Sequence, residues 1–111
     1  MLSKATLAAV ALFSIAAAVP AQAQSATEIQ LSYKDKKFDP AEISAPANTP
    51  IVIKLKNLDS KAMEFESKTL KVEKVIPSKG EGVVNVRAQK AGRYEFFDEF
   101  NEKGRGAVVV E

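Results

Sequence analysis

The sequence has 111 residues, with 16 lysine and arginine residues, 14 aspartate and glutamate residues and a formal net charge of +2. It contains no cysteine and no histidine, which excludes thiolate nucleophiles, imidazole bases, zinc fingers and haem sites with either ligand. Basic and acidic residues alternate along the chain instead of clustering, so we predict no nucleic-acid partner.

The first residues have the pattern of a secretory signal. Lys4 precedes an apolar run that ends at Val19, and small residues follow up to Ala23. This run is short for a membrane span. We therefore predict a signal peptide over residues 1–23, and a single mature domain over residues 24–111 that is not membrane-embedded and lies in the periplasm.

The remaining sequence predicts about eight short strands and no long helix. Turn-forming residues fall between the strands, and Gly104 is expected in the turn before the last one. Many short strands at close spacing are typical of an all-β sandwich. The expected strands lie near residues 28–33, 42–45, 51–57, 63–66, 69–76, 83–88, 93–98 and 106–110.

Alternation of apolar and polar residues assigns the faces of these strands. Over residues 51–56, positions 51, 53 and 55 point to the core, and Lys54 and Lys56 face water. Near the end of the chain Tyr94, Phe96 and Asp98 are expected to point inward. A buried carboxylate must be paired, hydrogen-bonded or bound to a metal, so Asp98 is a candidate metal ligand or an acceptor of backbone N–H groups.

Three segments, in this order, resemble the cupredoxin family. They are Phe38-Asp39-Pro40 before a strand, Asn57 at the end of a strand, and residues 92–97 before the apolar strand near the end of the chain. The resemblance covers nearly all of the mature chain. It implies a Greek-key β-sandwich of cupredoxin type.

The copper ligands of cupredoxins are absent from the matching positions. The resemblance places the first histidine ligand at Met63, the cysteine ligand at Asp98 and the second histidine ligand at Asn101. Type 1 copper needs a thiolate and two imidazoles. A blue electron-transfer centre is therefore excluded.

Residues 35–40, 61–66 and 94–100 are similar to the cupredoxin-like domains of bacterial periplasmic iron-uptake systems, of the EfeO and FtrB kind. This resemblance implies that the protein binds ferrous iron, oxidises it and delivers the ferric iron to a high-affinity iron permease. The implied partners are that permease and a second periplasmic iron-binding subunit. In many relatives a histidine stands at the position of Asn101, and EfeO domains have a cysteine at that of Asp98.

Carboxylate oxygens suit hard ions such as Mn²⁺ and iron. The candidate metal ligands are Asp35, Asp98, Glu64, Glu66 and Met63, and the resemblance alone makes the two glutamates candidates. Asp35 and Asp98 are also the candidate catalytic residues for iron oxidation. Each has a plainer interpretation. Asp35 is then a solvated loop acid, the two glutamates lie on an outward face opposite Met63, and the methionine fills the core.

We therefore expect a protein that binds iron, as Fe²⁺ and Fe³⁺, with copper or manganese as alternatives. The sequence leaves open whether the protein acts as a ferroxidase. Two other functions also stay open, a metal-free binding module and a copper-binding subunit of the same system. The sequence leaves a homodimer open as well.

Overall fold

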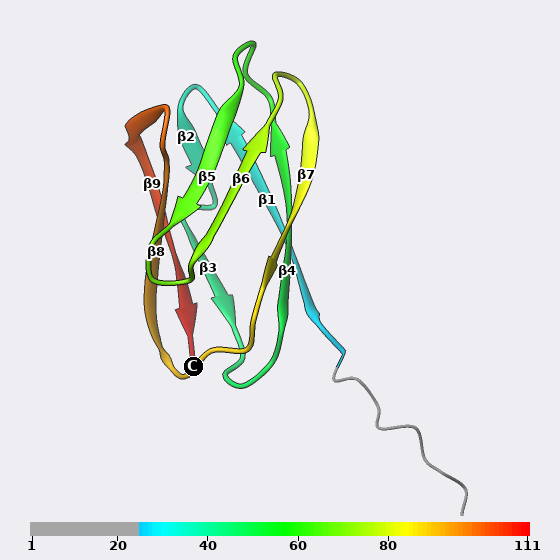
Figure 1. The fold of residues 1–111 in the computed structure, drawn as a ribbon, viewed down its shortest axis with the longest axis vertical. Helices are drawn as coiled ribbons and strands as arrows, with labels where there is room; N and C mark the ends of the chain where they lie inside the picture. The colour runs from blue at the N-terminus through cyan, green and yellow to red at the C-terminus, as the bar shows by residue number, and fades with distance from the viewer. Residues whose placement is uncertain (1–24) are drawn as a thin grey trace, which may run out of the picture.

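The computed structural model describes residues 25–111, which form nine β-strands and no helix (Figure 1). The predicted signal peptide lies outside the described residues. Within residues 25–111 there is accordingly no helix long and apolar enough to cross a membrane. The strands are β1 (Thr27–Lys34), β2 (Lys37–Asp39), β3 (Glu42–Ala45), β4 (Ile51–Asn57), β5 (Met63–Ser67), β6 (Val72–Ile76), β7 (Glu81–Val86), β8 (Gly92–Asp98) and β9 (Asn101–Val110).

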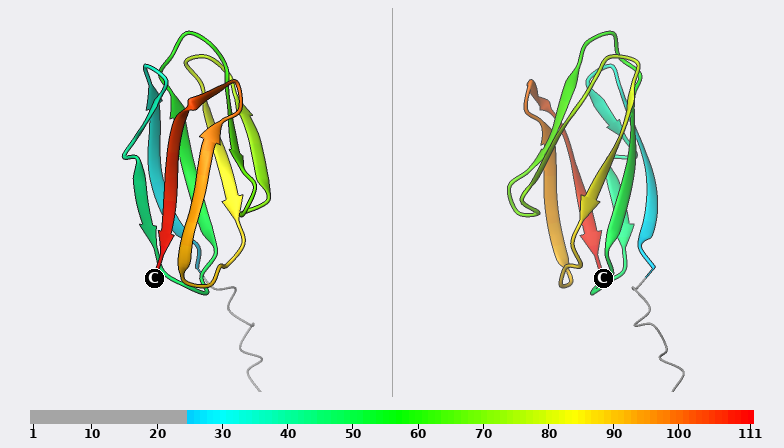
Figure 2. Two further views of the ribbon diagram at one scale, coloured as in Figure 1. Left: turned by 90° about the vertical axis from the view of Figure 1, so that its left-hand side faces the viewer. Right: turned by 45° about the vertical axis from the view of Figure 1, so that its right-hand side comes forward.

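The strands form two sheets that pack face to face (Figure 2). One sheet has the order β2-β1-β4-β7 and the other β3-β9-β8-β5-β6. The pairs β1–β4 and β3–β9 are parallel, and the remaining pairs are antiparallel. The prediction of an all-β sandwich is confirmed.

The core lies between the sheets and follows from the alternation in the sequence. In β4 the residues Ile51, Ile53 and Leu55 are buried, while Lys54 and Lys56 are exposed. Four aromatic rings pack together in one end of the core. Tyr33 packs on Phe38 with ring centroids 4.7 Å apart. The rings of Phe38, Phe65 and Phe96 continue this cluster, with Phe96 4.8 Å from each of the other two.

Several strand boundaries differ from the prediction. The strand β2 was not predicted, because three residues are too short to show alternation; it forms as the second arm of a hairpin with β1. The strand β6 begins at Val72 instead of residue 69, because a turn containing Lys71 with a φ of 57° precedes it. The strand β7 begins at Glu81, which pairs with Lys56 of β4, and ends at Val86.

The last strand is longer than predicted. It begins at Asn101 instead of residue 106, because a tight turn pairs Asn101 directly with Asp98. Gly104 therefore lies inside β9 and not in a turn.

The turns at one end of the sandwich lie together. These are the β1–β2, β4–β5, β6–β7 and β8–β9 connections, at the top of Figure 1, while the C-terminus lies at the opposite end. We refer to the first of these as the loop end. It contains Asp98 and Asp35, the two residues for which the sequence predicts catalysis.

Candidate functional site

Asp98 is a buried carboxylate whose hydrogen bonds are made within the protein. It is 3 % exposed at the end of β8. Its Oδ1 atom accepts the backbone N–H of Glu64 at 2.9 Å and that of Phe100 at 3.0 Å. Its Oδ2 atom accepts the hydroxyl of Tyr33 at 2.6 Å. The predicted inward position is confirmed, and these three donors offset the cost of burying the charge.

Tyr33 joins the two sheets at this point, since it belongs to β1 and Asp98 to β8. Burial, the hydrogen bond to Asp98 and the negative charge of Asp98 raise the pKa of the tyrosine well above its usual value. The hydroxyl therefore stays a donor at all physiological pH values. Gly104 leaves the room for this contact, because a Cβ atom there would lie 2.8 Å from the tyrosine hydroxyl oxygen.

An open hollow of about 650 Å³ lies at the loop end above this pair. Asp98 and Tyr33 are among the residues that line it, as are Asp35, Asp59 and the exposed ring of Phe100. The structure thus brings the two predicted catalytic carboxylates to one hollow. Their roles in metal binding and catalysis stay predictions.

Asp59 holds the turn that carries Asp35. Asp35 and Lys36 have positive φ values of 51° and 62°, the left-handed region that non-glycine residues seldom adopt. The carboxylate of Asp59 accepts the backbone N–H of Asp35 at 2.7 Å and that of Lys36 at 3.0 Å. These two bonds to a charged acceptor help to offset the strain of the turn.

Asn57 connects two loops of the same end. Its side chain is almost fully buried, at 1 % exposed. The amide group donates to the carbonyl oxygens of Lys61 at 2.8 Å, Pro77 at 3.1 Å and Ile76 at 3.3 Å. Its Oδ1 atom accepts the N–H of Asp59 at 3.0 Å. The asparagine therefore positions the loop that carries Asp59.

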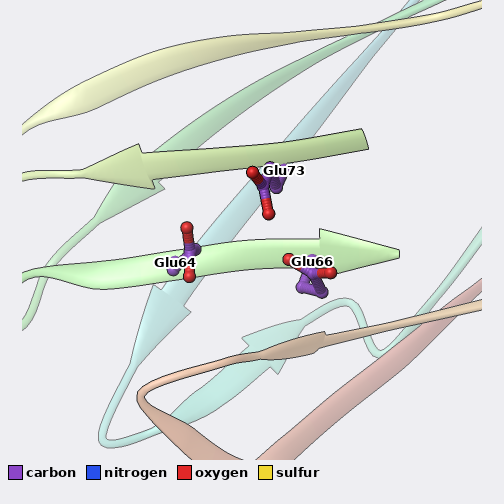
Figure 3. Close-up of side chains that lie close together, drawn as sticks. All are labelled: Glu64, Glu66 and Glu73. Carbon is purple, nitrogen blue, oxygen red and sulfur yellow. The ribbon is translucent and has the colours of Figure 1, made fainter. Parts of the chain in front are cut away.

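A group of three carboxylates lies on the outer face of the larger sheet (Figure 3). Glu64 and Glu66 come from β5 and Glu73 from β6, and one oxygen atom of each lies within 4.8 Å of the others. Glu66 and Glu73 are direct cross-strand partners. Among residues 25–111 this is the only such group of three acidic side chains. We call it the glutamate cluster.

The glutamate cluster contains two predicted residues and one that was not predicted. Glu64 and Glu66 face away from the core, and Met63 on the same strand is fully buried. The sequence holds no signal for Glu73, because its place beside Glu66 depends on the register between two strands.

Crowded negative charge affects the acids of the cluster. Partial burial and the charges of Glu73, Glu99 and Asp98 raise the pKa of Glu64. Burial, and then a hydrogen bond and charge repulsion with Glu73, raise the pKa of Glu66. Both effects disfavour the ionised form of the carboxyl groups. A bound cation would therefore stabilise the cluster most at neutral pH.

These shifts predict how stability depends on pH. With raised pKa values, the folded chain binds more protons than the unfolded chain above the ordinary value of 4.5. The contribution of these groups to the free energy of unfolding therefore falls as pH rises from about 4.5 through the raised pKa values. We expect Glu66→Gln to raise the melting temperature near pH 7 and to change it less near pH 4, in thermal unfolding without metal.

Glu102→Gln is the matched control for that measurement, since Glu102 is exposed on β9 and lies outside the cluster. Glu102→Gln should leave the difference in melting temperature between pH 4 and pH 7 unchanged. Equal effects of the two substitutions at both pH values would contradict the repulsion in the cluster.

The two-sheet architecture defines a β-sandwich of cupredoxin type. The chain matches the cupredoxin-like domain family over residues 5–110, and it belongs to that family.

Two known proteins with similarity to this chain are a bacterial relative and a solved domain structure. An uncharacterized protein of Rickettsia prowazekii (strain Madrid E) is 31% identical over 84 residues, which cover 75% of this chain and 67% of the relative. The metal-binding domain of the Cu(I)-exporting P-type ATPase CopA of Streptococcus pneumoniae D39 superposes with a TM-score of 0.69 at 21% identity, covering 76% of this chain and 84% of that one.

Two further solved structures share the fold. A copper-binding protein in the apo form has a TM-score of 0.67 at 22% identity, over 76% of this chain and 86% of its own. The reduced Cu(I) form of an amicyanin point mutant has a TM-score of 0.61 at 14% identity, over 78% of this chain and 85% of its own. At these identities the likeness establishes the fold alone.

The residues that the sequence resemblance places at the copper position do not fit type 1 copper. Met63 is fully buried in the core, and the carboxylate of Asp98 already accepts three hydrogen bonds. The whole sequence has no cysteine or histidine, whereas that centre needs one thiolate and two imidazoles. Any metal bound by this chain has oxygen ligands for the most part.

Proposed function

We propose that this protein binds iron as cargo in the periplasm and favours its oxidation from Fe²⁺ to Fe³⁺ on the way to a high-affinity iron permease. The observation that supports iron binding most directly is the glutamate cluster of Glu64, Glu66 and Glu73. The periplasmic location, the permease and a second iron-binding subunit are proposed from the signal sequence and the resemblance to iron-uptake proteins.

The chemistry of the cluster favours a hard cation. Carboxylate oxygens bind Mn²⁺ and iron well, and they stabilise Fe³⁺ more than Fe²⁺ because the trivalent ion attracts anionic oxygen more strongly. Such ligands lower the reduction potential of the bound ion, so that Fe²⁺ gives up its electron more easily to an acceptor outside this chain. Three carboxylates on an open surface also leave room for water and for exchange of the cargo.

The hollow at the loop end offers a second position, which the sequence favours. Asp35 and Asp98 both line it. The three hydrogen bonds to Asp98 make it a weaker candidate ligand than the glutamates, because a metal would compete with donors that are already in place. The two positions make different predictions for the same experiment.

Anaerobic titration with Fe²⁺, followed by the rate of Fe²⁺ oxidation in air, tests the proposal. We expect Glu66→Gln to weaken Fe²⁺ binding by about ten- to a hundredfold, the effect of losing one charged ligand, and to slow oxidation. Affinity should also fall as pH falls, because protons compete for the same carboxylates.

Two variants serve as comparisons. Glu102→Gln, which removes a charge outside the cluster, should leave iron binding and oxidation unchanged. A loss of binding in Asp35→Asn but not in Glu66→Gln would move the site to the hollow. No binding of Fe²⁺, Mn²⁺ or Cu²⁺ by the unmodified protein would favour the metal-free binding module.

A copper-binding subunit is the second candidate function, because the similar folds include a Cu(I)-loaded domain and a copper-binding protein. The same titration with Cu²⁺ addresses it. Stronger binding of Cu²⁺ than of iron, with loss of the copper site in Glu66→Gln, would favour this alternative.

A further inference from the structure

The two sheets end in four edge strands, β2, β7, β3 and β6. An edge strand presents unpaired backbone N–H and C=O groups, and proteins protect such edges with short strands or with charged side chains, some of which point inward. Three of the four edges have such a feature. β2 has three residues and β3 has four. In β6, the exposed Lys74 is paired in register with the buried Phe65, so it starts from the core side of the sheet.

The fourth edge, β7, lacks this protection. It has six residues, Glu81–Val86, with no lysine, arginine or proline among them, and its one charged residue stands at its start. The side chain of Val83, near the middle of the strand, is 45 % exposed. The strand runs along one side of the sandwich (Figure 1). An exposed strand of this kind is a template for pairing with another strand.

The register with β4 shows which backbone groups of β7 are unpaired. The N–H of Asn57 donates to the carbonyl oxygen of Gly80 at 2.8 Å, so these residues form a hydrogen-bonded pair next to the ladder of β4 and β7. In an antiparallel pair, hydrogen-bonded positions recur at every second residue. The even-numbered residues of β7 therefore bond to β4, and the backbone groups of Glu81, Val83 and Asn85 point away from it. Among residues 25–111 these groups have no backbone partner.

We propose that β7 pairs with β7 of a second copy of the chain, antiparallel and about a two-fold axis at Val84, so that the two four-stranded sheets join into one. In this register Glu81 of each copy lies opposite Arg87 of the other. Val83 of each copy likewise lies opposite Asn85 of the other. The backbone groups that point away from β4 then face one another across the axis, and each contact occurs twice, as two-fold symmetry requires.

The charges along this edge fit a second copy. Glu81 forms an ion pair with Lys56 of β4 at 3.4 Å. Arg87 is exposed just after β7 and belongs to no ion pair within residues 25–111. The two-fold pairing places Glu81 between Lys56 and Arg87 of the second copy, so unlike charges meet. A register centred on Val83 would instead place Arg87 opposite Lys79, a like-charge pair that opposes association.

The other charged residues beside β7 do not oppose the pairing. Lys54 forms an ion pair with Glu28 at 2.9 Å, on the side of β4 away from the edge. Lys74 of β6 lies beside Gly82, where a Cβ atom would be 3.8 Å from its Cε atom. The two copies of Gly82 are four positions apart along the paired strands, which is about 13 Å, so the two Lys74 side chains do not meet.

Sedimentation equilibrium of the purified protein with a metal chelator tests the proposal. The average mass should rise from one copy toward two with concentration. Val83→Lys places a lysine near the middle of the edge, as in naturally protected edges, and should weaken association about tenfold or more. Val75→Lys is the matched control, because Val75 is 51 % exposed on β6. It should associate as the unmodified protein does.

Charge exchange tests the contact between Glu81 and Arg87. Glu81→Lys places two cations opposite each other, and Arg87→Glu places two acids opposite each other. Each variant alone should associate about tenfold more weakly than the unmodified protein. In an equimolar mixture the lysine of one variant lies opposite the glutamate of the other. Association should therefore return in the mixture.

Introduced thiols test the register, because the chain has no cysteine of its own. Mild oxidation of a mixture of Val83→Cys and Asn85→Cys should link the two variants, since paired Cα atoms lie about 5.5 Å apart, within the range of a disulfide. Either variant alone should form covalent dimers more slowly. Faster linking of Val83→Cys to itself than to Asn85→Cys would overturn the register centred on Val84.

A monomer at every concentration would overturn the proposal. So would association that Val83→Lys leaves unchanged, or a mixture of the two charge variants that stays monomeric. The glutamate cluster lies on the other sheet, and the dimer is measured without metal. Failure of the dimer and failure of iron binding are therefore separate results.

Discussion

Replacing Asp98 by alanine should lower the free energy of unfolding by about 3–5 kcal/mol, because each buried donor that loses its acceptor costs about 1–3 kcal/mol. The substitution leaves the hydroxyl of Tyr33 and the N–H groups of Glu64 and Phe100 without their acceptor. Urea denaturation followed by circular dichroism measures the change. A loss below about 1 kcal/mol, typical of an ordinary neutral hydrogen bond, would contradict the structural role.

Asp98→Asn separates the structural role from a role in metal binding. Its amide oxygen still accepts the two backbone N–H groups, so we expect a smaller loss of stability than in the alanine variant. A purely structural Asp98 leaves the Fe²⁺ affinity of the folded variant unchanged. A weaker Fe²⁺ affinity without loss of stability would instead support the metal role suggested by the sequence.

Tyr33→Phe completes the comparison. A double-mutant cycle with Asp98→Asn should give a coupling energy of about 0.5–3 kcal/mol, because the two side chains are in direct contact. Additive effects would mean that the hydrogen bond between the two sheets contributes nothing of its own.

Asn57→Ala should produce the second large loss of stability, about 2–4 kcal/mol, because it removes a buried side chain that satisfies several backbone groups at once. The carbonyl oxygens of Lys61 and Pro77 and the N–H of Asp59 lose their partner together. Thermal and urea unfolding measure the effect.

Asn57→Asp is the sharper variant at this position. It keeps the shape and the acceptor for Asp59, but it replaces the donating amide by a negative charge that faces carbonyl oxygens. We expect it to be at least as destabilising as alanine. A stable Asn57→Asp protein would mean that shape, and not the amide donor, holds the two loops.

The sequence predicted the parts of the fold that depend on local pattern. Alternation placed Phe96 and Asp98 inward and Glu64 and Glu66 outward, and the structure confirms these faces. Alternation could not predict β2, because three residues hold too little of a period. It also could not predict where β9 begins, because this depends on how tightly the chain turns after Asp98.

The candidate site was predictable only in part. The sequence indicates that Asp98 needs a partner, but it does not identify Tyr33, which lies 65 positions away. Glu73 joins the cluster through the register of β6 on β5. Asp59 acts on the turn at Asp35 from another loop, 24 positions along the chain. In each case the missing information is a contact between distant segments.

The same distant contacts affect the order in which the chain folds. Tyr33 and Asp98 meet across 65 positions, and β3 pairs with β9, the last strand of the chain. Bringing such segments together costs loop-closure entropy before any contact offsets it, so a topology of this kind folds slowly. The larger sheet cannot close until the last residues are available, and the buried carboxylate stays accessible to water until then. A nascent chain that lacks β9 therefore leaves β3 without the only strand with which it pairs among residues 25–111.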